Sequence, residues 1–368
     1  MLNYSVAELR VNKYTQNNYQ KYMDLSDLKQ TLNKVLKGCG CMSIAFFGLL
    51  VLVAIFSDDD ESKSDTDNSD QKEKTEQVEK KDSVIVNEPL AGDPYKELDD
   101  LIGLEDVKKE VRSLANFVKV QKQREAKGLK TAKVSYHLVF YGSPGTGKTT
   151  VARIIGRIYK DLGVLKKGHT VETDRSGLVA KFMGQTALKT DTVVQQAIHG
   201  VLFIDEAYAL VPEGGGGQDY GQEAISALLK RMEDYRDSLV VIIAGYKDEM
   251  QRFIDSNPGL QSRFNRYIDF PDYTGGELTD IFKMYMKKNQ YTLSPDAETY
   301  LRERFDYAVA HKDRNFGNAR YARNVFEKSI QQQANRLEGK TNLSKEELTE
   351  LTVADLQEGF AAKTNIGK

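Results

Sequence analysis

The strongest constraint on the fold is a glycine-rich octapeptide that lies between an apolar run and an amphipathic helix pattern. Residues 142–149 read Gly-Ser-Pro-Gly-Thr-Gly-Lys-Thr and match the pattern G-x-x-x-x-G-K-[ST]. The residues HLVFY precede the octapeptide, and TTVARIIGRIY overlaps its end and continues beyond it. Glycines let successive backbone N–H groups face one ligand, and the following helix directs its positive end to the same place. The segment therefore predicts a phosphate-binding loop between a strand and a helix.

This loop predicts ATP and Mg²⁺ as cofactors. Lys148 would place its charge near the β- and γ-phosphates, and the Thr149 hydroxyl would bind Mg²⁺. A dinucleotide-binding turn of the G-x-G-x-x-G type is the alternative, but Thr150 stands where its third glycine is required. The residues assigned to the nucleotide here are Gly142, Ser143, Pro144, Gly145, Thr146, Gly147, Lys148, Thr149 and Thr150.

A second apolar run ends in two carboxylates. Asp205 and Glu206 directly follow the residues VLFI at 201–204. Ligands of open α/β sheets bind at the carboxyl ends of strands, so Asp205 is expected to hold Mg²⁺ through its water shell. Glu206 is expected to orient the water that attacks the γ-phosphate. A solvated strand end is the alternative; the phosphate-binding loop about 55 residues earlier favours the catalytic interpretation.

Apolar runs alternate with amphipathic helices from about Tyr95, which predicts an α/β fold with a parallel sheet covered on both faces. After Pro271 only helical patterns follow, which predicts a C-terminal α-helical lid domain. The predicted strands are 137–142, 169–174, 201–207, 239–245 and 266–270. The predicted helices are 104–125, 148–161, 187–198, 221–234 and 248–254 in the first part, then 275–289, 294–309, 317–337 and 344–360 in the second.

The N-terminal quarter has a different character. Residues 1–37 form a polar juxtamembrane segment, and the uncharged stretch 38–56 is long enough at ~28 Å for one transmembrane helix. A buried core helix and a cleavable signal peptide are the alternatives. Residues 57–94 are rich in Asp, Glu, Lys and Ser and are predicted to be an acidic flexible linker. We expect a single-pass membrane protein with its ATPase domain in the cytoplasm, although the lysines before the span favour the opposite orientation.

Composition excludes several classes of protein. With 52 basic and 54 acidic residues the net charge is −2, so no nucleic-acid partner is expected. The two cysteines, Cys39 and Cys41, cannot supply a disulfide framework. The four histidines are scattered along the chain without zinc-ligand spacing.

The segments GSPGTGKTT, VLFIDEA and SRFNR together resemble the AAA+ ATPases. Within them the chain is similar to the group of stage V sporulation protein K and the red-type Rubisco activases (CbbX), through GHTVETDRSGLVAKFMGQTALKT, AGYKDEM, SNPGLQSRF and FGNARYARN. The likeness covers roughly residues 97–360. It implies an AAA+ large α/β ATPase domain at 95–272 and a small helical lid domain with a tail at 273–368.

The resemblance also implies roles for individual residues. Ile102 and Gly103 match the segment near the adenine, and Arg320 matches the sensor-2 arginine of the lid. Arg263 matches the arginine finger that reaches a neighbouring subunit's ATP site, and Arg266 matches a supporting arginine. A homo-oligomer, most simply a hexamer, follows from this implication. Without the resemblance, each arginine would be read as a member of a surface salt bridge.

The same resemblance assigns Phe182, Met183 and Gly184 to the pore loop that grips a polypeptide in ring-forming motors. One departure stands at the end of the fourth predicted strand of the large domain, where Ala244-Gly245-Tyr246 replaces the Asn or Thr that many members carry. The expected function is a membrane-tethered ring that hydrolyses ATP to remodel or thread a protein substrate. The alternatives are an ATP-gated membrane scaffold that recruits partners without threading and a DNA-remodelling ATPase.

Overall fold

The computed structural model describes residues 84–131, 134–182, 184–211 and 220–361. The predicted membrane span at 38–56, the segment 1–37 before it and Met183 lie outside these residues. No helix of the described residues has both the length and the apolar character that a membrane span requires.

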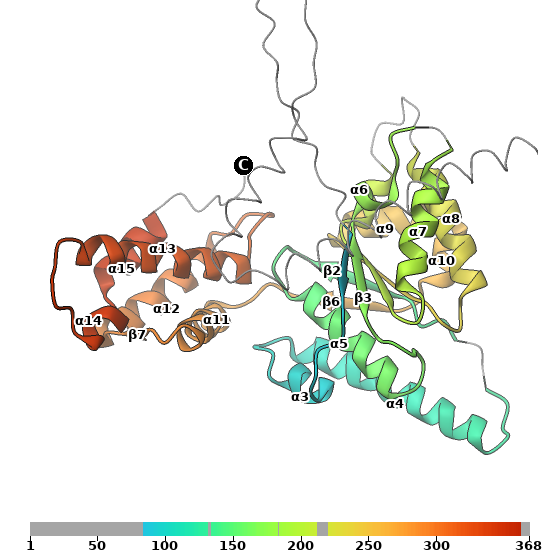
Figure 1. Ribbon diagram of the computed structural model, residues 1–368, viewed down its shortest axis with the longest axis horizontal. Helices are drawn as coiled ribbons and strands as arrows, with labels where there is room; N and C mark the ends of the chain where they lie inside the picture. Colours follow the sequence, from blue (N-terminus) through green and yellow to red (C-terminus); the bar gives the residue numbers. More distant parts are fainter. Residues whose placement is uncertain (1–83, 132–133, 183, 212–219, 362–368) are drawn as a thin grey trace, which may run out of the picture. The chain divides into compact units, whose positions relative to one another are not determined.

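A six-stranded sheet forms the centre of the α/β domain within the described residues (Figure 1). Its order is β1-β3-β4-β5-β2-β6, and all pairs are parallel except the antiparallel pair of β1 with β3. The parallel sheet is therefore confirmed. The predicted linker 57–94 extends too far, because β1 lies within it. The strands are β1 Ile85–Asn87, β2 Leu138–Gly142, β3 Thr170–Thr173, β4 Val201–Ile204, β5 Val240–Gly245 and β6 Tyr267–Phe270.

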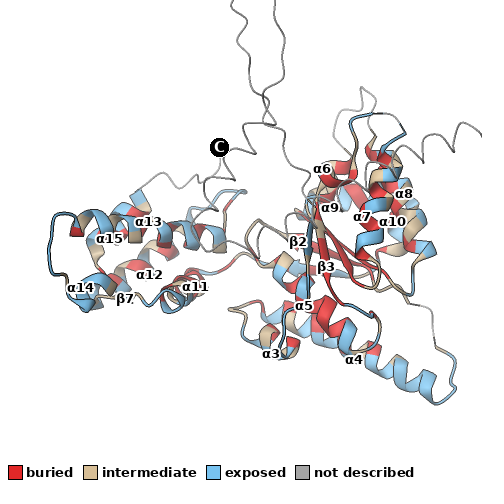
Figure 2. Ribbon diagram, in the orientation of Figure 1, coloured by how far each residue is buried: buried red, intermediate tan, exposed pale blue. Residues whose placement is uncertain are grey.

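Helices cover both faces of this sheet, and the side chains of β2, β4 and β5 alternate between two hydrophobic clusters. Leu138 and Phe140 of β2 belong to one cluster, and Val139 and Tyr141 belong to the other. Figure 2 shows the strands buried between these layers. One face carries α3 Pro94–Asp99, α4 Glu105–Ala126 and α5 Lys148–Asp161. The other carries α6 Arg175–Leu178, α7 Thr186–Ala197, the 3₁₀ helix η1 Ala207–Leu210, α8 Gly221–Asp234, α9 Lys247–Asp255 and α10 Pro258–Arg263.

The lid is helical, as predicted. The prediction that strands end at Pro271 is wrong in one detail, because β7 Thr292–Leu293 pairs in parallel with β8 Glu350–Leu351. The single helix predicted at 344–360 is also wrong, since β8 divides it. Buried Gln333 donates its amide protons to the carbonyls of Glu347, Leu348 and Glu350, which hold the chain where the helix breaks. The helices are α11 Gly275–Lys288, α12 Pro295–Ala310, α13 Ala319–Leu337, α14 Lys345–Thr349 and α15 Val353–Ala361.

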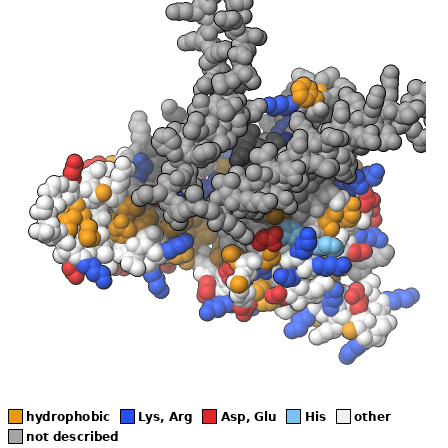
Figure 3. Space-filling model, in the orientation of Figure 1, with side chains coloured by type: hydrophobic (Ala, Val, Ile, Leu, Met, Phe, Trp, Pro, Cys, Tyr) orange, Lys and Arg blue, Asp and Glu red, His pale blue; other side chains and the backbone are white. Residues whose placement is uncertain are grey.

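Local signals fix the start of the lid. Thr274 and Glu277 form a capping box, in which each side chain accepts a hydrogen bond from the other residue's backbone N–H. Behind it, Phe282 packs edge-on against Phe326 with ring centroids 5.5 Å apart. On the face shown in Figure 3, acidic and basic side chains are interspersed over the described residues, so neither sign of charge dominates that face.

Candidate active site

The glycine-rich loop connects the buried strand β2 to helix α5. Gly147 precedes the helix with φ 95°, and Gly145 has φ 74°, so both occupy the left-handed region that favours glycine. A Cβ atom on Gly145 would lie 2.2 Å from the carbonyl oxygen of Gly317, because the lid approaches the loop here. Inside the loop, the hydroxyl of buried Thr146 donates to the carbonyl of Ser143 at 2.9 Å.

Lys148 lies in the first turn of α5 and points back into the loop. Its Nζ donates to the carbonyls of Gly142 at 2.8 Å and Ser143 at 2.7 Å. Burial lowers the pKa of its ammonium group, while the carboxylates of Asp205 and Glu206 act in the opposite direction. The amino group of Lys148 thus lies at the mouth of the loop, beside the N-terminal end of a helix.

Asp205 and Glu206 follow β4 directly, as the sequence predicted. The backbone N–H of Asp205 donates to the carbonyl of Thr173 on the neighbouring strand at 2.9 Å, which extends the parallel ladder by one residue. Asp205 Oδ1 accepts from the N–H of Glu206 at 3.1 Å. Glu206 has φ 47° and is exposed, so a non-glycine residue in a left-handed conformation presents its carboxylate at the strand end.

These parts enclose a cavity of about 230 Å³. It brings together the loop, the two carboxylates after β4, Tyr246 after β5 and Arg320 of the lid. The residues that line it are Gly142, Pro144, Gly145, Gly147, Lys148, Thr149, Thr150, Asp205, Glu206, Gly245, Tyr246, Ala319 and Arg320. The described residues contain no cluster of three or more His, Cys, Asp or Glu side chains that could hold a metal ion. Thr149 and Asp205 fit Mg²⁺ only if nucleotide phosphates and water supply further ligands.

Some predicted residues lie outside this cavity. Ile102 and Gly103 precede α4 and do not line it; their neighbour Leu104 packs near Gly147 instead. Arg263 ends α10, where its guanidinium donates to the carbonyl of Gly259 and pairs with Glu233 at 3.4 Å. Their roles in binding nucleotide remain predictions.

Arg266 lies outside this cavity too. The guanidinium of Arg266 lies over the ring of Phe117, 4.9 Å from its centroid. The structure therefore does not bring either predicted arginine of the SRFNR segment to the ATP cavity of its own chain.

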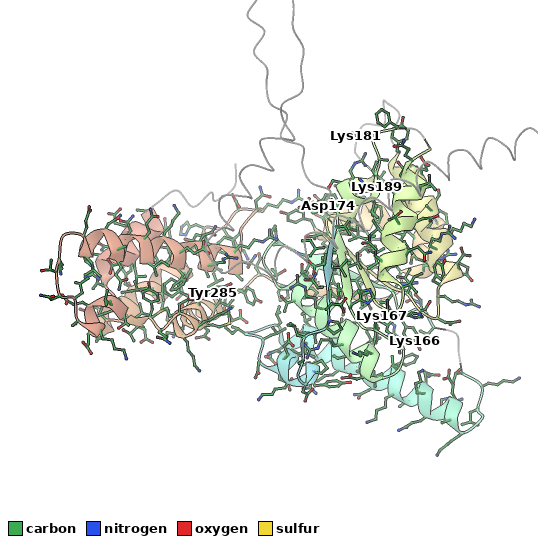
Figure 4. The ribbon with its side chains drawn as sticks, in the orientation of Figure 1. Lys166, Lys167, Asp174, Lys181, Lys189 and Tyr285 are labelled. Carbon is green, nitrogen blue, oxygen red and sulfur yellow. The ribbon has the colours of Figure 1, made fainter. Side chains whose placement is uncertain are left out.

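The predicted pore loop follows β3 and α6 and does not line this cavity. Phe182 is 66% exposed, and no atom lies within 4 Å of the position that a Cβ on Gly184 would take. Figure 4 shows Lys181, the neighbour of Phe182, beyond α6 at the end of the domain. A large aromatic side chain is therefore presented to solvent on an open loop.

Sequence reasoning missed the polar residues that join the lid to the loop. Asn318 is fully buried, and its side chain contacts Pro144 of the loop, and Asp272 and Tyr273 of the connection into the lid. The motif FGNAR contains Asn318, but only its arginine matched a known role. An asparagine beside a glycine normally indicates a turn, so its contacts with a segment 174 residues away gave no local signal.

Tyr246 also has a role that the sequence did not indicate. Its hydroxyl donates to Asn315 Oδ1 of the lid at 3.3 Å, and the guanidinium of Arg314 lies 5.3 Å from its ring centroid. Tyr246 therefore lines the cavity with one part of its side chain and contacts the lid with another.

Comparison with known protein families agrees with this geometry. The family model described as "ATPase family associated with various cellular activities (AAA)" matches residues 138–272, and the AAA lid domain model matches residues 274–366. The chain is 44% identical over 246 residues to stage V sporulation protein K of Bacillus subtilis (strain 168), covering 66% of this chain and 75% of that protein. It is 46% identical over 244 residues to protein CfxQ of Xanthobacter flavus, with 66% and 75% covered.

A further relative is the chloroplastic ribulose bisphosphate carboxylase/oxygenase activase of Cyanidioschyzon merolae (strain NIES-3377 / 10D). It is 45% identical over 242 residues, which cover 65% of this chain and 80% of that protein. Among solved structures, the AAA domain of FIGL-1 in complex with ADP superposes with a TM-score of 0.53 at 17% identity. That match covers 75% of this chain and 85% of the other, and it supports the fold.

Proposed function

The chain belongs to the AAA ATPase family and hydrolyses ATP, and on that basis we propose that it works as a hexameric ring that remodels or threads a protein substrate. Members of this family are typically oligomeric. The relatives are named for sporulation and for ribulose bisphosphate carboxylase/oxygenase, so their names indicate no single target. The substrate class proposed is therefore an unfolded or partly unfolded segment of a protein.

In the proposed site each residue has one role. Lys148 and the loop N–H groups would bind the phosphates of ATP, and Thr149 with Asp205 would hold Mg²⁺, which would supply positive charge to the phosphates. Glu206 orients the attacking water at the open end of the cavity. Arg320 enters the same cavity from the lid, so the nucleotide contacts both domains.

Arg263 acts on a neighbouring subunit in this proposal. The support is its position, since it ends α10 and does not line the cavity of its own chain. A planar guanidinium that enters from the next subunit can meet the charge that develops on the γ-phosphoryl oxygens. Such arginines contribute ~10³–10⁵ in rate. Assembly into a ring then becomes part of catalysis.

The observation that carries the threading proposal is the exposure of Phe182 on an open loop. An aromatic ring offers a large apolar contact to an extended chain without reading its sequence. Leaving 66% of such a side chain in water is unfavourable for the isolated subunit, at ~25 cal/mol per Å² of apolar surface. Contact with a substrate would remove that surface from water.

Substitution of Phe182 by alanine tests this proposal. We expect Phe182→Ala to lose substrate processing while its basal ATP hydrolysis stays within about twofold of the wild type, because the side chain is exposed and does not line the cavity. Tyr307→Ala, which removes a 54% exposed aromatic from the lid, is the matched control and should process normally. Clients are first identified by capture on full-length Glu206→Gln protein with ATP. If Phe182→Ala processes them at the wild-type rate, threading is wrong and the scaffold is favoured.

We also propose that residues 38–56 anchor the ring in a membrane with the ATPase domain in the cytoplasm. The support is the uncharged 19-residue stretch itself. Deleting residues 38–56 should move the protein from the membrane fraction to the soluble fraction of a lysate. An unchanged distribution would contradict the anchor.

A further inference from the structure

One buried carboxamide ties together three segments around the phosphate-binding loop. Oδ1 of Asn318 accepts from the backbone N–H of Tyr273 at 2.9 Å. Its Nδ2 donates to Asp272 Oδ1 at 2.9 Å, to the carbonyl of Phe316 at 3.1 Å and to the carbonyl of Pro144 at 3.3 Å. Asn318 has no exposed surface. The side chain therefore joins the loop, the connection between the domains and the lid, without contact with solvent.

The backbone of Asn318 adopts a conformation that glycine would adopt more easily. It has φ 48° and ψ −122°, a region in which an L side chain is strained. Helix α13 begins at the next residue, yet the Asn318 side chain makes no capping hydrogen bond to it. Neither turn formation nor helix capping explains an asparagine here, whereas the contacts of the carboxamide do.

The turn that Asn318 holds also sets the position of Arg320. The backbone N–H of Ala319 donates to the carbonyl of Gly145 at 3.1 Å, so the first residue of α13 is bonded directly to the loop. The carbonyl of Gly317 approaches Gly145 so closely that only glycine fits there. Arg320 is the next residue of the helix, and its side chain lines the cavity. Any shift of this turn would move Arg320 with it.

The partner of Asn318 is kept ionised by its surroundings. Asp272 Oδ2 accepts from Lys312 Nζ at 2.6 Å while Oδ1 accepts from Asn318. Burial raises the pKa of Asp272, but the hydrogen bonds from Lys312, Asn318 and Ser143 outweigh it and hold that pKa below its usual range. A carboxylate at this place requires a donor opposite it. The amide of asparagine supplies one, and the carboxylate of aspartate would not.

We propose that Asn318 is a positioning residue that fixes the start of helix α13 on the phosphate-binding loop and thereby places Arg320 in the ATP cavity. The inference rests on the function proposed above for Arg320. It adds that the lid and the loop move together, because one side chain bonds to both. Asn318 itself does not line the cavity.

Asn318→Asp is the sharpest single change, because it keeps shape and replaces the donors by acceptors. Asparagine and aspartate cap helices about equally well, so a capping role would survive the substitution. The new carboxylate would instead face Asp272 and the carbonyls of Pro144 and Phe316. We expect kcat/KM for ATP to fall at least about tenfold, with the free energy of unfolding measured in parallel.

A double-mutant cycle separates positioning from a general loss of stability. Arg320→Gln is measured for kcat and KM in the wild-type and Asn318→Asp backgrounds of the full chain. We expect Arg320→Gln to lower kcat/KM in the wild-type background. In the Asn318→Asp background it should change kcat/KM less than about twofold, because Arg320 is already displaced there. Asn335→Asp makes the same chemical change at an exposed position of the same helix, where the effect of Arg320→Gln should stay at its wild-type size.

Asn318→Gly provides a second variant that the backbone conformation favours, so it should fold even if the aspartate variant does not. It too should abolish the effect of Arg320→Gln. Equal effects of Arg320→Gln in the wild-type and Asn318 variant backgrounds would overturn the proposal. A wild-type protein that hydrolyses no ATP would instead contradict the function proposed above. In that case the double-mutant cycle would be measured as affinity for ADP. Equal effects of Arg320→Gln on that affinity in the wild-type and Asn318 variant backgrounds would again overturn the role of Asn318.

Discussion

At the scale of single residues, the site depends on residues whose backbone is held in an unfavourable conformation. Glu206 and Asn318 both have positive φ, a conformation that costs of order 1–3 kcal/mol for residues other than glycine. Both lie at ends of elements that are themselves well anchored, after β4 and before α13. The surrounding sheet and lid supply the stability that keeps these two residues in place.

His137, directly before β2, should make the stability of the α/β domain depend on pH. Its Nδ1 accepts from the N–H of Val241 at 3.0 Å, and burial with the nearby charge of Arg263 lowers its pKa from 6.5 to about 4. Between about pH 4 and pH 6.5, the imidazole of His137 is therefore protonated in the unfolded chain but not in the folded chain. The free energy of unfolding should fall by about 2 kcal/mol from pH 7.5 to pH 5.

Urea unfolding at a series of pH values measures this effect against a matched variant. In His137→Asn the amide oxygen can accept from Val241 in place of Nδ1 but does not titrate. The difference in unfolding free energy between wild type and variant should therefore narrow or reverse toward acid pH. A constant difference from pH 7.5 to pH 5 would show that His137 is not held neutral.

The roles of single residues could be predicted only where those residues belong to a motif that is contiguous in the sequence. The loop at 142–149 and the pair Asp205 and Glu206 are contiguous in sequence, and the structure places most of them around one cavity. Asn318 was missed because its partners outside the lid, Tyr273, Asp272 and Pro144, are 45 to 174 residues away, so no spacing pattern links them.

At the scale of elements, strands buried on both faces were predictable because they read as unbroken apolar runs. β4 and β5 have every residue buried, and their bounds differ from the predicted ranges only at the ends. β1 was missed because it is three residues long, lies at the edge of the sheet and is mostly exposed. The break between α14 and α15 depends on the buried contacts of Gln333, which local periodicity does not reveal.

Strand β4, which directly precedes Asp205 and Glu206, should be sensitive to loss of side-chain volume. Phe203 of β4 is 2% exposed within the core. Phe203→Ala should destabilise the α/β domain by about 3–5 kcal/mol, because it removes buried apolar surface and leaves a cavity. The midpoint of urea unfolding measures this. Leu188→Ala, at a 68% exposed position of α7, is the control and should change stability by less than about 0.5 kcal/mol. Equal destabilisation by the two variants would contradict the assigned core.

At the scale of the whole molecule, the fold and the ATPase activity follow from a short stretch of sequence, and the assembly does not. The isolated chain has a cavity with a lysine, two carboxylates and a lid arginine, but Arg263 lies elsewhere. If Arg263 of a neighbouring subunit completes the ATP site, as we propose, the structure of one subunit does not contain the whole site. The proposed ring therefore makes a prediction that no property of the monomer would produce.

Mixing two inactive variants tests the shared site most directly. Glu206→Gln lacks the carboxylate that we propose orients the attacking water but retains Arg263, whereas Arg263→Ala retains an intact cavity. Each alone should hydrolyse ATP at least about 10²-fold more slowly than the wild type. Random co-assembly in equal amounts should restore up to about a quarter of the wild-type rate. In about one interface in four, a subunit that retains Glu206 meets a neighbour that retains Arg263. No recovery on mixing, or full activity of Arg263→Ala alone, would contradict the account.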